Sequence, residues 1–246
     1  MKFQNEIKKG IFLKRYKRFF ADIEVDGRLE VAHVPNTGSL KGCIEPGSEC
    51  LVTYKNDPNR KLKYTLELIK TPSSWVGVNT SHPNFLVYEL WSKKIVPHWK
   101  HFDNAQREIK ISKETRLDLA LWSSAHNFAT QKGRLVEIKP PVHFIEVKNV
   151  TLIKNNTAQF PDSETTRGQK HLLELIALKD RGFSCELVFV VQRQDVSHFS
   201  PADDIDPVYG QYLRQAQEKG VTITAFPTIL TDDGIELTAQ ALPLKL

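Results

Sequence analysis

The sequence predicts a mixed α/β protein in two parts, a small all-β unit followed by a larger unit of alternating strands and helices. The first part is predicted from five short β-rich segments, separated by turn residues, within residues 10–80. The second is predicted from the order strand, helix, strand, helix, strand between residues 143 and 227. Such an order needs crossover connections, which are typical of a sheet with parallel strands. We expect two domains, residues 1–82 and 83–246.

The first unit is expected to be a small β-barrel. Asp26-Gly27 favours a two-residue hairpin turn, and residues 56–59 are a cluster of turn formers. Five short strands in about 70 residues are typical of compact barrels such as the OB-fold. Between the second and third strands, residues 35–42 form either a phosphate-binding loop or a simple tight turn. The predicted strands are 10–25, 28–34, 49–55, 60–70 and 74–79.

Basic side chains interleave with aromatic ones in this unit. Cations can follow the phosphates of DNA while aromatic rings stack on its bases. Residues 1–90 carry 14 Lys and Arg against 10 Asp and Glu, whereas residues 91–246 carry 20 against 19. The excess fits a polyanionic partner, although solvated edge residues give the same pattern, and we expect Phe19 and Phe20 to fill the barrel core. The candidate DNA-binding residues are Lys14, Arg15, Lys17, Arg18, Arg60, Lys61 and Lys63.

Helices and strands alternate in the second unit. Asn84 is predicted to cap a helix over 85–94, which carries Glu89 either on its surface or as an acid facing a metal site. Residues 95–150 are expected to form a strand, a long hairpin with an extended loop at 123–134, and another strand. Four histidines in or near that unit, His98, His101, His126 and His143, are too irregularly spaced to be predicted as ligands. The later elements are a helix containing 167–175 and ending at Gly182, a strand over 185–193, a helix around 207–219 and a strand over 221–227.

Two strands carry the candidate catalytic residues, RLDLALW (116–122) and HFIEVKNVTL (143–152). Side chains alternate between the faces of a strand, so Glu146 and Lys148 point the same way. Asp118 points away from its apolar neighbours on the earlier strand. If the two strands pair, Asp118 and Glu146 meet within reach of one Mg²⁺ or Mn²⁺ ion, a cation that prefers carboxylate oxygens, water and phosphate.

The remaining residues of this pattern suggest phosphodiester cleavage. Lys148 would stand beside the attacking water or the charge that develops on phosphorus. Gln169, on the following helix, could orient Lys148 or the substrate. The alternative is that Glu146 and Lys148 are a solvated strand face. A similar pair, Glu137 and Lys139, is followed by Pro140-Pro141 and cannot lie on a central strand.

The composition indicates the cellular compartment and argues against several classes of site. No segment approaches the roughly 20 apolar residues of a membrane span, and the N-terminal sequence lacks an apolar signal core. Cys43, Cys50 and Cys185 have no paired spacing, which argues against a zinc site and against disulfides. We therefore expect a cytoplasmic protein that does not bind membranes and could form a homo-oligomer.

Several whole phrases of the sequence occur in a known family. AHVPNTGSLKG, WVGVNT, IEVKNVTL and FPDSETTRGQKHL, among others, resemble the sugar fermentation stimulation protein A family along nearly the whole chain. The resemblance implies an OB-like β-barrel followed by a PD-(D/E)xK nuclease-like mixed-sheet domain. It also implies DNA binding, a nuclease role and a regulatory link to sugar metabolism.

The same resemblance carries over to individual positions. It implies that Asp118 and Glu146 are the acidic pair and Lys148 the lysine of the nuclease motif, with Glu89 as a first-helix acid and Gln169 as a helical glutamine. The chain departs from the motif at Leu117, which stands where the proline is expected, and in the long loop 123–142.

Two functional hypotheses remain open. The first is a metal-dependent nuclease with an OB-type DNA-binding domain. The second is a non-catalytic DNA-binding regulator of transcription on a nuclease scaffold. A scaffold for another protein is a third possibility that the sequence neither supports nor excludes.

Overall fold

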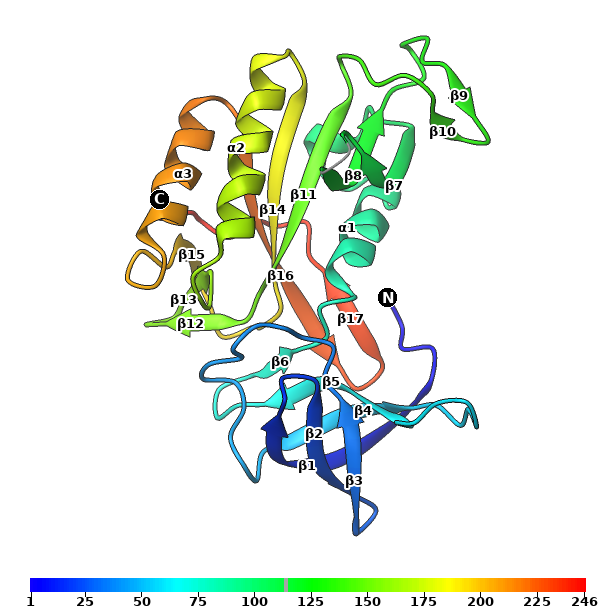
Figure 1. Cartoon of the computed structure of the whole chain (residues 1–246), viewed down its shortest axis with the longest axis vertical. Coiled ribbons are helices and arrows are strands. Elements are labelled where there is room, and N and C mark those ends of the chain that lie inside the picture. Colours follow the sequence, from blue (N-terminus) through cyan, green and yellow to red (C-terminus); the bar gives the residue numbers. More distant parts are fainter. Residues whose placement is uncertain (113–114) are drawn as a thin grey trace.

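A computed structural model describes residues 1–112 and 115–246 of the chain. Residues 113 and 114, within the predicted 95–150 unit, lie outside the described residues. Among the described residues, the long strands form two six-stranded sheets, one at each end of the molecule (Figure 1). The N-terminal sheet has the order β3-β2-β1-β4-β5-β6, and the C-terminal sheet has the order β17-β16-β14-β11-β8-β7.

The N-terminal sheet closes on itself. Its strands are β1 (Glu6–Tyr16), β2 (Phe20–Val25), β3 (Arg28–His33), β4 (Glu49–Tyr54), β5 (Tyr64–Lys70) and β6 (Trp75–Gly77). β3 pairs with β2 on one side and with β5 on the other, so the five long strands make a small barrel. Phe12, Ile23 and Leu66 are buried in its core. The predicted OB-like barrel is confirmed.

One predicted strand of the barrel, residues 10–25, is in fact two strands. The chain reverses between β1 and β2, where Lys17 and Arg18 adopt left-handed backbone conformations with φ of 48° and 62°. Residues other than glycine seldom adopt these angles, and the segment contains no Gly, Pro or Asn there to indicate a turn. The turn places Phe19 in solvent, 43% exposed, so the prediction that Phe19 fills the core is wrong. Phe20 is only partly buried and stacks on Tyr16.

The C-terminal sheet is mixed, and the predicted α/β class is confirmed. β11 pairs in parallel with β14, which pairs in parallel with β16, whereas β7, β8 and β17 are antiparallel to their neighbours. The sheet strands are β7 (Asn104–Lys110), β8 (Arg116–Trp122), β11 (His143–Val150), β14 (Ser184–Val191), β16 (Thr222–Thr231) and β17 (Gly234–Leu237). The helical elements are α1 (Pro83–Ser92), η1 (Pro97–Trp99), α2 (Thr166–Asp180) and α3 (Pro207–Glu218).

Helices cover both faces of this sheet (Figure 1). On one face, α2 and α3 lie side by side and bury Leu172 and Leu213 against Phe144. On the other face, α1 buries Leu86 against Ile145 and Val188. Successive side chains of β11 point into opposite cores, because a strand has a two-residue period. β14 is apolar along its length because helices cover both faces of the sheet.

Several smaller elements were not predicted. β12 (Leu152–Lys154), β13 (Thr157–Phe160) and β15 (His198–Pro201) make a three-stranded sheet, and β9 (Thr130–Gln131) pairs with β10 (Arg134–Leu135) in the predicted loop. The Asn84 cap is also incorrect. α1 begins at Pro83 with His82 as its N-cap residue, so Asn84 lies inside the helix. The caps of α2 and α3 are Thr165 and Asp206, whose side chains accept from backbone N–H groups.

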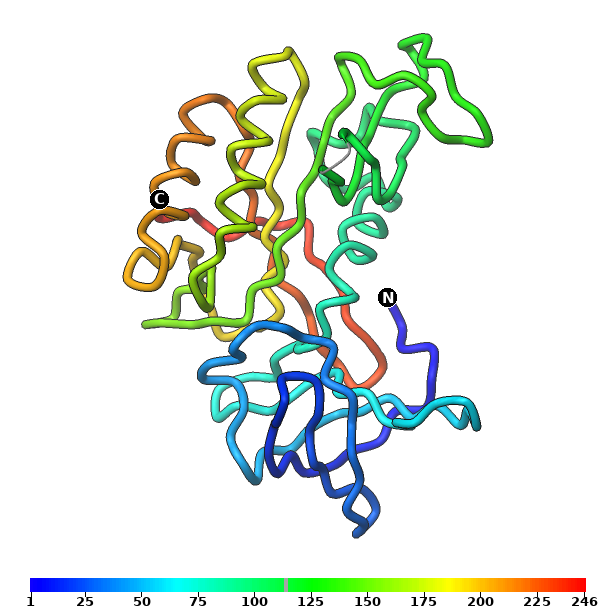
Figure 2. Tube along the Cα trace, viewed as in Figure 1, coloured from blue at the N-terminus to red at the C-terminus, as the bar shows by residue number. Residues whose placement is uncertain are grey.

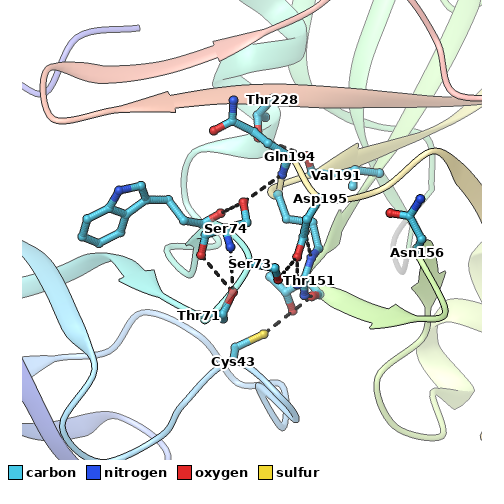
Figure 3. A network of polar contacts seen from close by, with 12 residues as sticks. Cys43, Thr71, Ser73, Ser74, Thr151, Asn156, Val191, Gln194, Asp195 and Thr228 are labelled. Atoms are coloured by element: carbon cyan, nitrogen blue, oxygen red, sulfur yellow. Dashed lines mark hydrogen bonds and ion pairs between the residues drawn. The ribbon is translucent and has the colours of Figure 1, made fainter.

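The two units meet at a buried arginine that follows β14. Arg193 donates to both carboxylate oxygens of Asp195, at 2.6 and 2.7 Å, and to the carbonyl of Thr151 at 2.7 Å. Two residues of the N-terminal unit reach the same place: Cys43 donates to the Thr151 carbonyl and Ser73 to the Asp195 carboxylate (Figure 3). This polar contact is therefore shared by both units, with Arg193, Cys43 and Thr151 buried in it.

The chain ends and the cysteines complete the description. Figure 2 shows the blue N-terminus running next to the red β17, where Met1 donates to the carbonyl of Ile235. All three cysteines are buried free thiols, and burial raises the pKa of Cys43 to about 11. In the part of the chain that the structure describes, no helix is long and apolar enough to cross a membrane.

Candidate metal and nucleic-acid site

Asp118 and Glu146 lie where two strands of the C-terminal sheet separate. β8 and β11 pair antiparallel from His143↔Leu121 to Ile145↔Leu119, and the next residues in this register are Asp118 and Glu146. There the ladder stops, and the backbone N–H of Val147 donates to Asp118 Oδ2 at 2.7 Å. The structure thus brings the two predicted carboxylates together; their role as metal ligands stays a prediction.

Asn84 fixes the second oxygen of Asp118. Its amide donates to Asp118 Oδ1 at 2.6 Å from the first turn of α1. The sequence pattern predicts that Asn84 caps the helix. In the structure it instead holds a carboxylate, with each Asp118 oxygen accepting one hydrogen bond.

Lys148 and an unpredicted histidine hold Glu146. Lys148 Nζ donates to Glu146 Oε1 at 2.7 Å, and His171 Nδ1 contacts the same oxygen. Lys148 Nζ also lies 3.1 Å from His171 Nδ1. A ring nitrogen either donates or accepts, so Nδ1 can serve only one of these partners at a time. His171 lies three residues after Gly168 and four before Leu175, on the buried side of α2, and that spacing is the signal from which it could have been found.

The two carboxylates differ in acidity. Burial, followed by the negative charge of Glu146, raises the pKa of Asp118 to about 7. Burial also acts to raise the pKa of Glu146, but the positive charge of Lys148 and the hydrogen bond from His171 outweigh it and lower that pKa. At neutral pH, Glu146 is therefore ionised while Asp118 is near its midpoint, so the pair is able to lose a proton when a cation arrives.

Two buried polar atoms, one in this cluster and one beside it, lack a hydrogen-bond partner among the described residues. Neither Glu146 Oε2 nor the Tyr209 hydroxyl makes a hydrogen bond to any residue that the structure describes. Tyr209 comes from α3, and its ring passes under α2 at Gly168, where a Cβ would lie 3.1 Å from ring atom Cε2. A buried acceptor without a donor is costly, and a cation or its bound water would satisfy Oε2.

The donor set suits a hard, oxygen-preferring cation. Within residues 1–112 and 115–246, no group of three or more His, Cys, Asp and Glu is placed to hold a metal. The protein would therefore offer two carboxylates, and water or phosphate would complete the shell, as is usual for Mg²⁺.

Glu89 and Gln169 bind partners outside the cluster. Glu89 follows Asn84 by five residues on α1, which turns it by about 140° around the helix axis. Its carboxylate instead binds the Met1 amine at 2.8 Å. Gln169 donates to both oxygens of Asp206, at 2.9 and 3.1 Å, and so links α2 to the cap of α3. In the part of the chain that the structure describes, Lys148 is hydrogen-bonded to Glu146 and His171 rather than to either of these residues.

The candidate DNA-binding cations form two separate clusters. β1 and β4 pair from Glu6↔Tyr54 to Ile11↔Glu49, so the loop after Tyr54 and the turn after Tyr16 lie at opposite ends of the barrel. Ten residues of strand span about 33 Å. The first cluster comprises Lys14, Arg15, Lys17 and Arg18, and the second comprises Arg60, Lys61 and Lys63.

Within the first cluster the four cations have different surroundings. Lys17 and Arg18 are exposed on the β1–β2 turn, next to exposed Phe19. Lys14 forms an ion pair with Asp22 at 3.1 Å. The guanidinium of Arg15 is held by hydrogen bonds, since it donates to the carbonyls of Asn36, Gly38 and Ser39 at 2.6 to 3.3 Å. Arg15 therefore shapes the 36–39 loop and is not free to bind phosphate.

A groove leads from this turn to the end of β11 and the start of α2. Two adjoining depressions, of about 350 and 260 Å³, share Thr37, Gly38 and Ser163. The first contains Lys17 and Arg18, and the second reaches Asn149 and Thr165. The loop approaches the other wall closely, since a Cβ at Gly38 would lie 2.7 Å from an Asp162 carboxylate oxygen. The groove therefore lies between the two units.

The second Glu-x-Lys sequence lies elsewhere. Glu137 and Lys139 are exposed, pair with each other at 3.6 Å and lie outside the six-stranded sheet. Their position agrees with the expectation from Pro140-Pro141, and they provide a matched control for Glu146 and Lys148.

Comparisons with known proteins agree with this architecture. A model of the sugar fermentation stimulation protein RE domain matches residues 81–234, and a model of the SfsA N-terminal OB domain matches residues 13–78. A sugar fermentation stimulation protein homolog of Bdellovibrio bacteriovorus is 51% identical over the whole of both chains, and one of Geobacter sulfurreducens is 40% identical over 94% of this chain and 93% of its own. The solved structure of Pyrococcus furiosus SfsA in complex with Ca²⁺ is 27% identical, with a TM-score of 0.84 over 100% of this chain and 98% of that one.

Proposed function

The chain belongs to the sugar fermentation stimulation protein family, and on that premise we propose that it binds DNA and hydrolyses phosphodiester bonds with a divalent cation, Mg²⁺ or Mn²⁺. One observation carries the proposal. Glu146 has one oxygen bound to Lys148 and His171 and the other buried without a partner, beside a second carboxylate of raised pKa. This arrangement suits a cation and a phosphate better than it suits a structural ion pair, which would leave no acceptor unpaired.

The related structure supports a cation that prefers oxygen ligands. The protein from Pyrococcus furiosus was solved with Ca²⁺, and Ca²⁺ and Mg²⁺ both bind carboxylates. In this chain Asp118 and Glu146 Oε2 would hold the cation. When bound, it would supply charge stabilisation on the phosphate and a more acidic water.

The side chains around the pair have separate roles in this proposal. Asn84 and the Val147 N–H hold the Asp118 carboxylate in place. Lys148 keeps a positive charge next to the reacting phosphate, where negative charge grows in the transition state. His171 Nδ1 contacts Glu146 Oε1 and so helps to hold the carboxylate that binds the Lys148 ammonium.

DNA would reach these residues along the groove between the two units. Lys17 and Arg18 would neutralise phosphates at its entrance, and exposed Phe19 offers a ring for stacking. The hydroxyl and amide side chains of Thr37, Asn149 and Thr165 line its length and can donate to phosphate oxygens.

A non-catalytic DNA-binding regulator is the second candidate. It is favoured by the small number of acidic ligands, since the described residues offer two carboxylates here, while Glu89 and Gln169 are engaged elsewhere. On this hypothesis the cluster binds a cation or phosphate without turnover.

A cleavage assay on several DNA forms separates the two. The nuclease hypothesis predicts cutting of double-stranded, single-stranded or branched DNA with Mg²⁺ or Mn²⁺ and none with EDTA. Glu146→Gln should abolish metal binding and cleavage. Lys148→Ala should lower kcat by about 100-fold or more while metal and DNA binding persist, because the charge acts mainly in the transition state.

Glu137→Gln with Lys139→Ala is the matched control and should leave cleavage unchanged. Metal binding that depends on Glu146, together with no cleavage of any DNA form, would favour the regulator.

A further inference from the structure

A second polar cluster lies on the opposite face of the C-terminal sheet. His143 has the strand parity of Ile145, which packs on the α1 face, whereas Glu146 has the parity of Phe144, on the α2 face. The four histidines that sequence spacing left unassigned, His98, His101, His126 and His143, line one cavity there, of about 450 Å³, together with Ser184.

Ser184, His143 and Glu186 form a hydrogen-bonded chain in this cavity wall. His143 and Ser184 are neighbours in the parallel register of β11 and β14, and Glu186 follows Ser184 by two residues on the same face. His143 Nδ1 lies 2.8 Å from Ser184 Oγ, and His143 Nε2 lies 3.2 Å from Glu186 Oε2. The imidazole is thus placed between a hydroxyl and a carboxylate.

The proton positions follow from Glu186. Its carboxylate is fully buried, and although burial acts to raise its pKa, hydrogen bonds from His143 and His98 outweigh this and hold the pKa at about 2. An ionised carboxylate only accepts, so His143 Nε2 carries a proton. When the ring is neutral, Nδ1 is the acceptor and Ser184 Oγ–H is the donor.

Other contacts hold the carboxylate and the ring in place. Trp99 Nε1 donates to Glu186 at 2.8 Å, and Thr224 Oγ1 donates to it at 2.6 Å. Phe102 stacks on the His143 ring with an interplanar angle of 15°. His143 is buried while Ser184 is exposed to the cavity. The hydroxyl is therefore accessible, and its base is shielded and oriented.

We propose that Ser184 is a nucleophile, activated by His143 and Glu186, that accepts the acyl group of a small carboxylic ester. A hydroxyl paired with an imidazole that a carboxylate orients is the arrangement that activates serine for acyl transfer, whatever the fold. The cavity volume fits a small ligand, and Phe102 and Pro141 give it an apolar wall for the acyl chain.

The reaction needs only ester and water. Ser184 Oγ bonds to the carbonyl carbon while its proton passes to His143 Nδ1. The bond from that carbon to the alcohol oxygen breaks, and the alcohol takes the proton from His143. Water then attacks the acyl-serine, with His143 again taking the proton, and carboxylic acid and free Ser184 result.

Turnover by this site is expected to be slow. The backbone N–H of Ser184 donates to the carbonyl of Val142, at 3.3 Å, so it does not face a developing oxyanion. Other side chains that are able to donate line the cavity, among them His101, His126 and Thr222. A missing oxyanion donor typically costs about 10²–10³ in kcat, so covalent trapping is a sharper test than turnover.

The test treats the full chain, in EDTA, with a fluorophosphonate probe and follows the mass of the intact protein. We expect one adduct, mapped to Ser184 after proteolysis, and none in Ser184→Ala. His143→Gln should lower the labelling rate by about 100-fold, the usual contribution of a general base. Ser123→Ala, which removes a second serine of the same cavity, and Glu137→Gln, at an exposed position outside the six-stranded sheet, should label at the wild-type rate.

Ser184→Cys gives a second readout that keeps the pairing with His143. Its thiol should react with iodoacetamide faster than the three buried native cysteines, whose pKa values burial raises to about 11 or 12. Three outcomes would show that Ser184, His143 and Glu186 form a purely structural chain. The first is an adduct on another residue, and the second is equal labelling of Ser184→Ala. The third is the absence of an adduct together with an unreactive introduced thiol in Ser184→Cys.

Discussion

At the scale of residues, the acidic pair shows how strongly neighbouring charges change the pKa of a carboxyl group. Asp118 and Glu146 are adjacent carboxylates, yet the pKa of Asp118 is raised to about 7 while that of Glu146 is lowered. The difference arises because Lys148 and His171 contact Glu146, whereas Asp118 receives neutral donors. Like charges this close disfavour double ionisation, so the pair retains a proton unless a cation replaces it.

The raised pKa of Asp118 makes metal-free stability depend on pH. Between about pH 4 and pH 7 the folded state holds a proton on Asp118 that the unfolded state has lost, so the free energy of unfolding falls as pH rises through this range. We expect Asp118→Asn to remove this fall, on the order of 2 kcal/mol for a partly buried group. Urea unfolding in EDTA at several pH values measures it.

Glu137→Gln serves as the control for that measurement, because Glu137 is exposed and should leave the pH profile unchanged. A profile for Asp118→Asn that runs parallel to the wild type would mean that Asp118 ionises normally in the fold.

Sequence patterns predicted the members of the cluster that share a strand or a register. The two-residue period of a strand is a local property, so Glu146, Lys148 and the facing Asp118 could be placed together. His171 and Tyr209 come from helices whose docking depends on the whole core. Asn84 satisfied a local rule for helix caps, but a tertiary contact with Asp118 determines its position.

At the scale of elements, the β1–β2 turn and the 36–39 loop act as one unit. The turn exposes Lys17 and Arg18, and Arg15 just before it binds three carbonyls of the loop. The turn could not be predicted, because its left-handed residues carry side chains and interrupt a continuous β-rich segment. The barrel itself was predictable, since its other turns use Asp, Asn, Gly and Pro.

This arrangement predicts different effects for cations of one cluster. If Lys17 and Arg18 contact phosphates, their replacement by Ala should weaken DNA binding and reduce the log–log salt slope by about 1.4–1.8, which is 0.7–0.9 for each contact. Arg15→Ala should weaken binding with a smaller change of slope, because Arg15 acts through the loop. Fluorescence anisotropy at several salt concentrations distinguishes the two.

Lys61→Ala with Lys63→Ala is the matched control at the far end of the barrel, about 33 Å away along β1. A loss of slope in this control as large as in the turn variant would place DNA on the far end instead.

At the scale of the whole molecule, the groove requires that the two units keep a fixed position relative to each other. Arg193 lies at the junction, with its guanidinium bound to Asp195 and to Thr151. Ser73 and Cys43 reach the same two residues from the N-terminal unit (Figure 3). Sequence patterns could not predict this junction, because its residues are separated by up to about 150 positions and follow no shared period.

The buried pair at the junction should therefore support both units at once. Arg193 is 2% exposed, and its removal leaves Asp195 without its charge partner, so Arg193→Ala should lower the free energy of unfolding by about 3–5 kcal/mol. The exposed pair of Arg214 and Asp203 is a matched control, since it has the same bidentate form and should cost less than about 1 kcal/mol when broken. Calorimetry measures both. We expect the wild type to unfold in a single transition, and we expect this transition to broaden or split in Arg193→Ala as the two units lose their coupling. Equal, small losses in the two variants would mean that the units are held together by other contacts, such as the pairing of Val76 with Arg193 through the backbone.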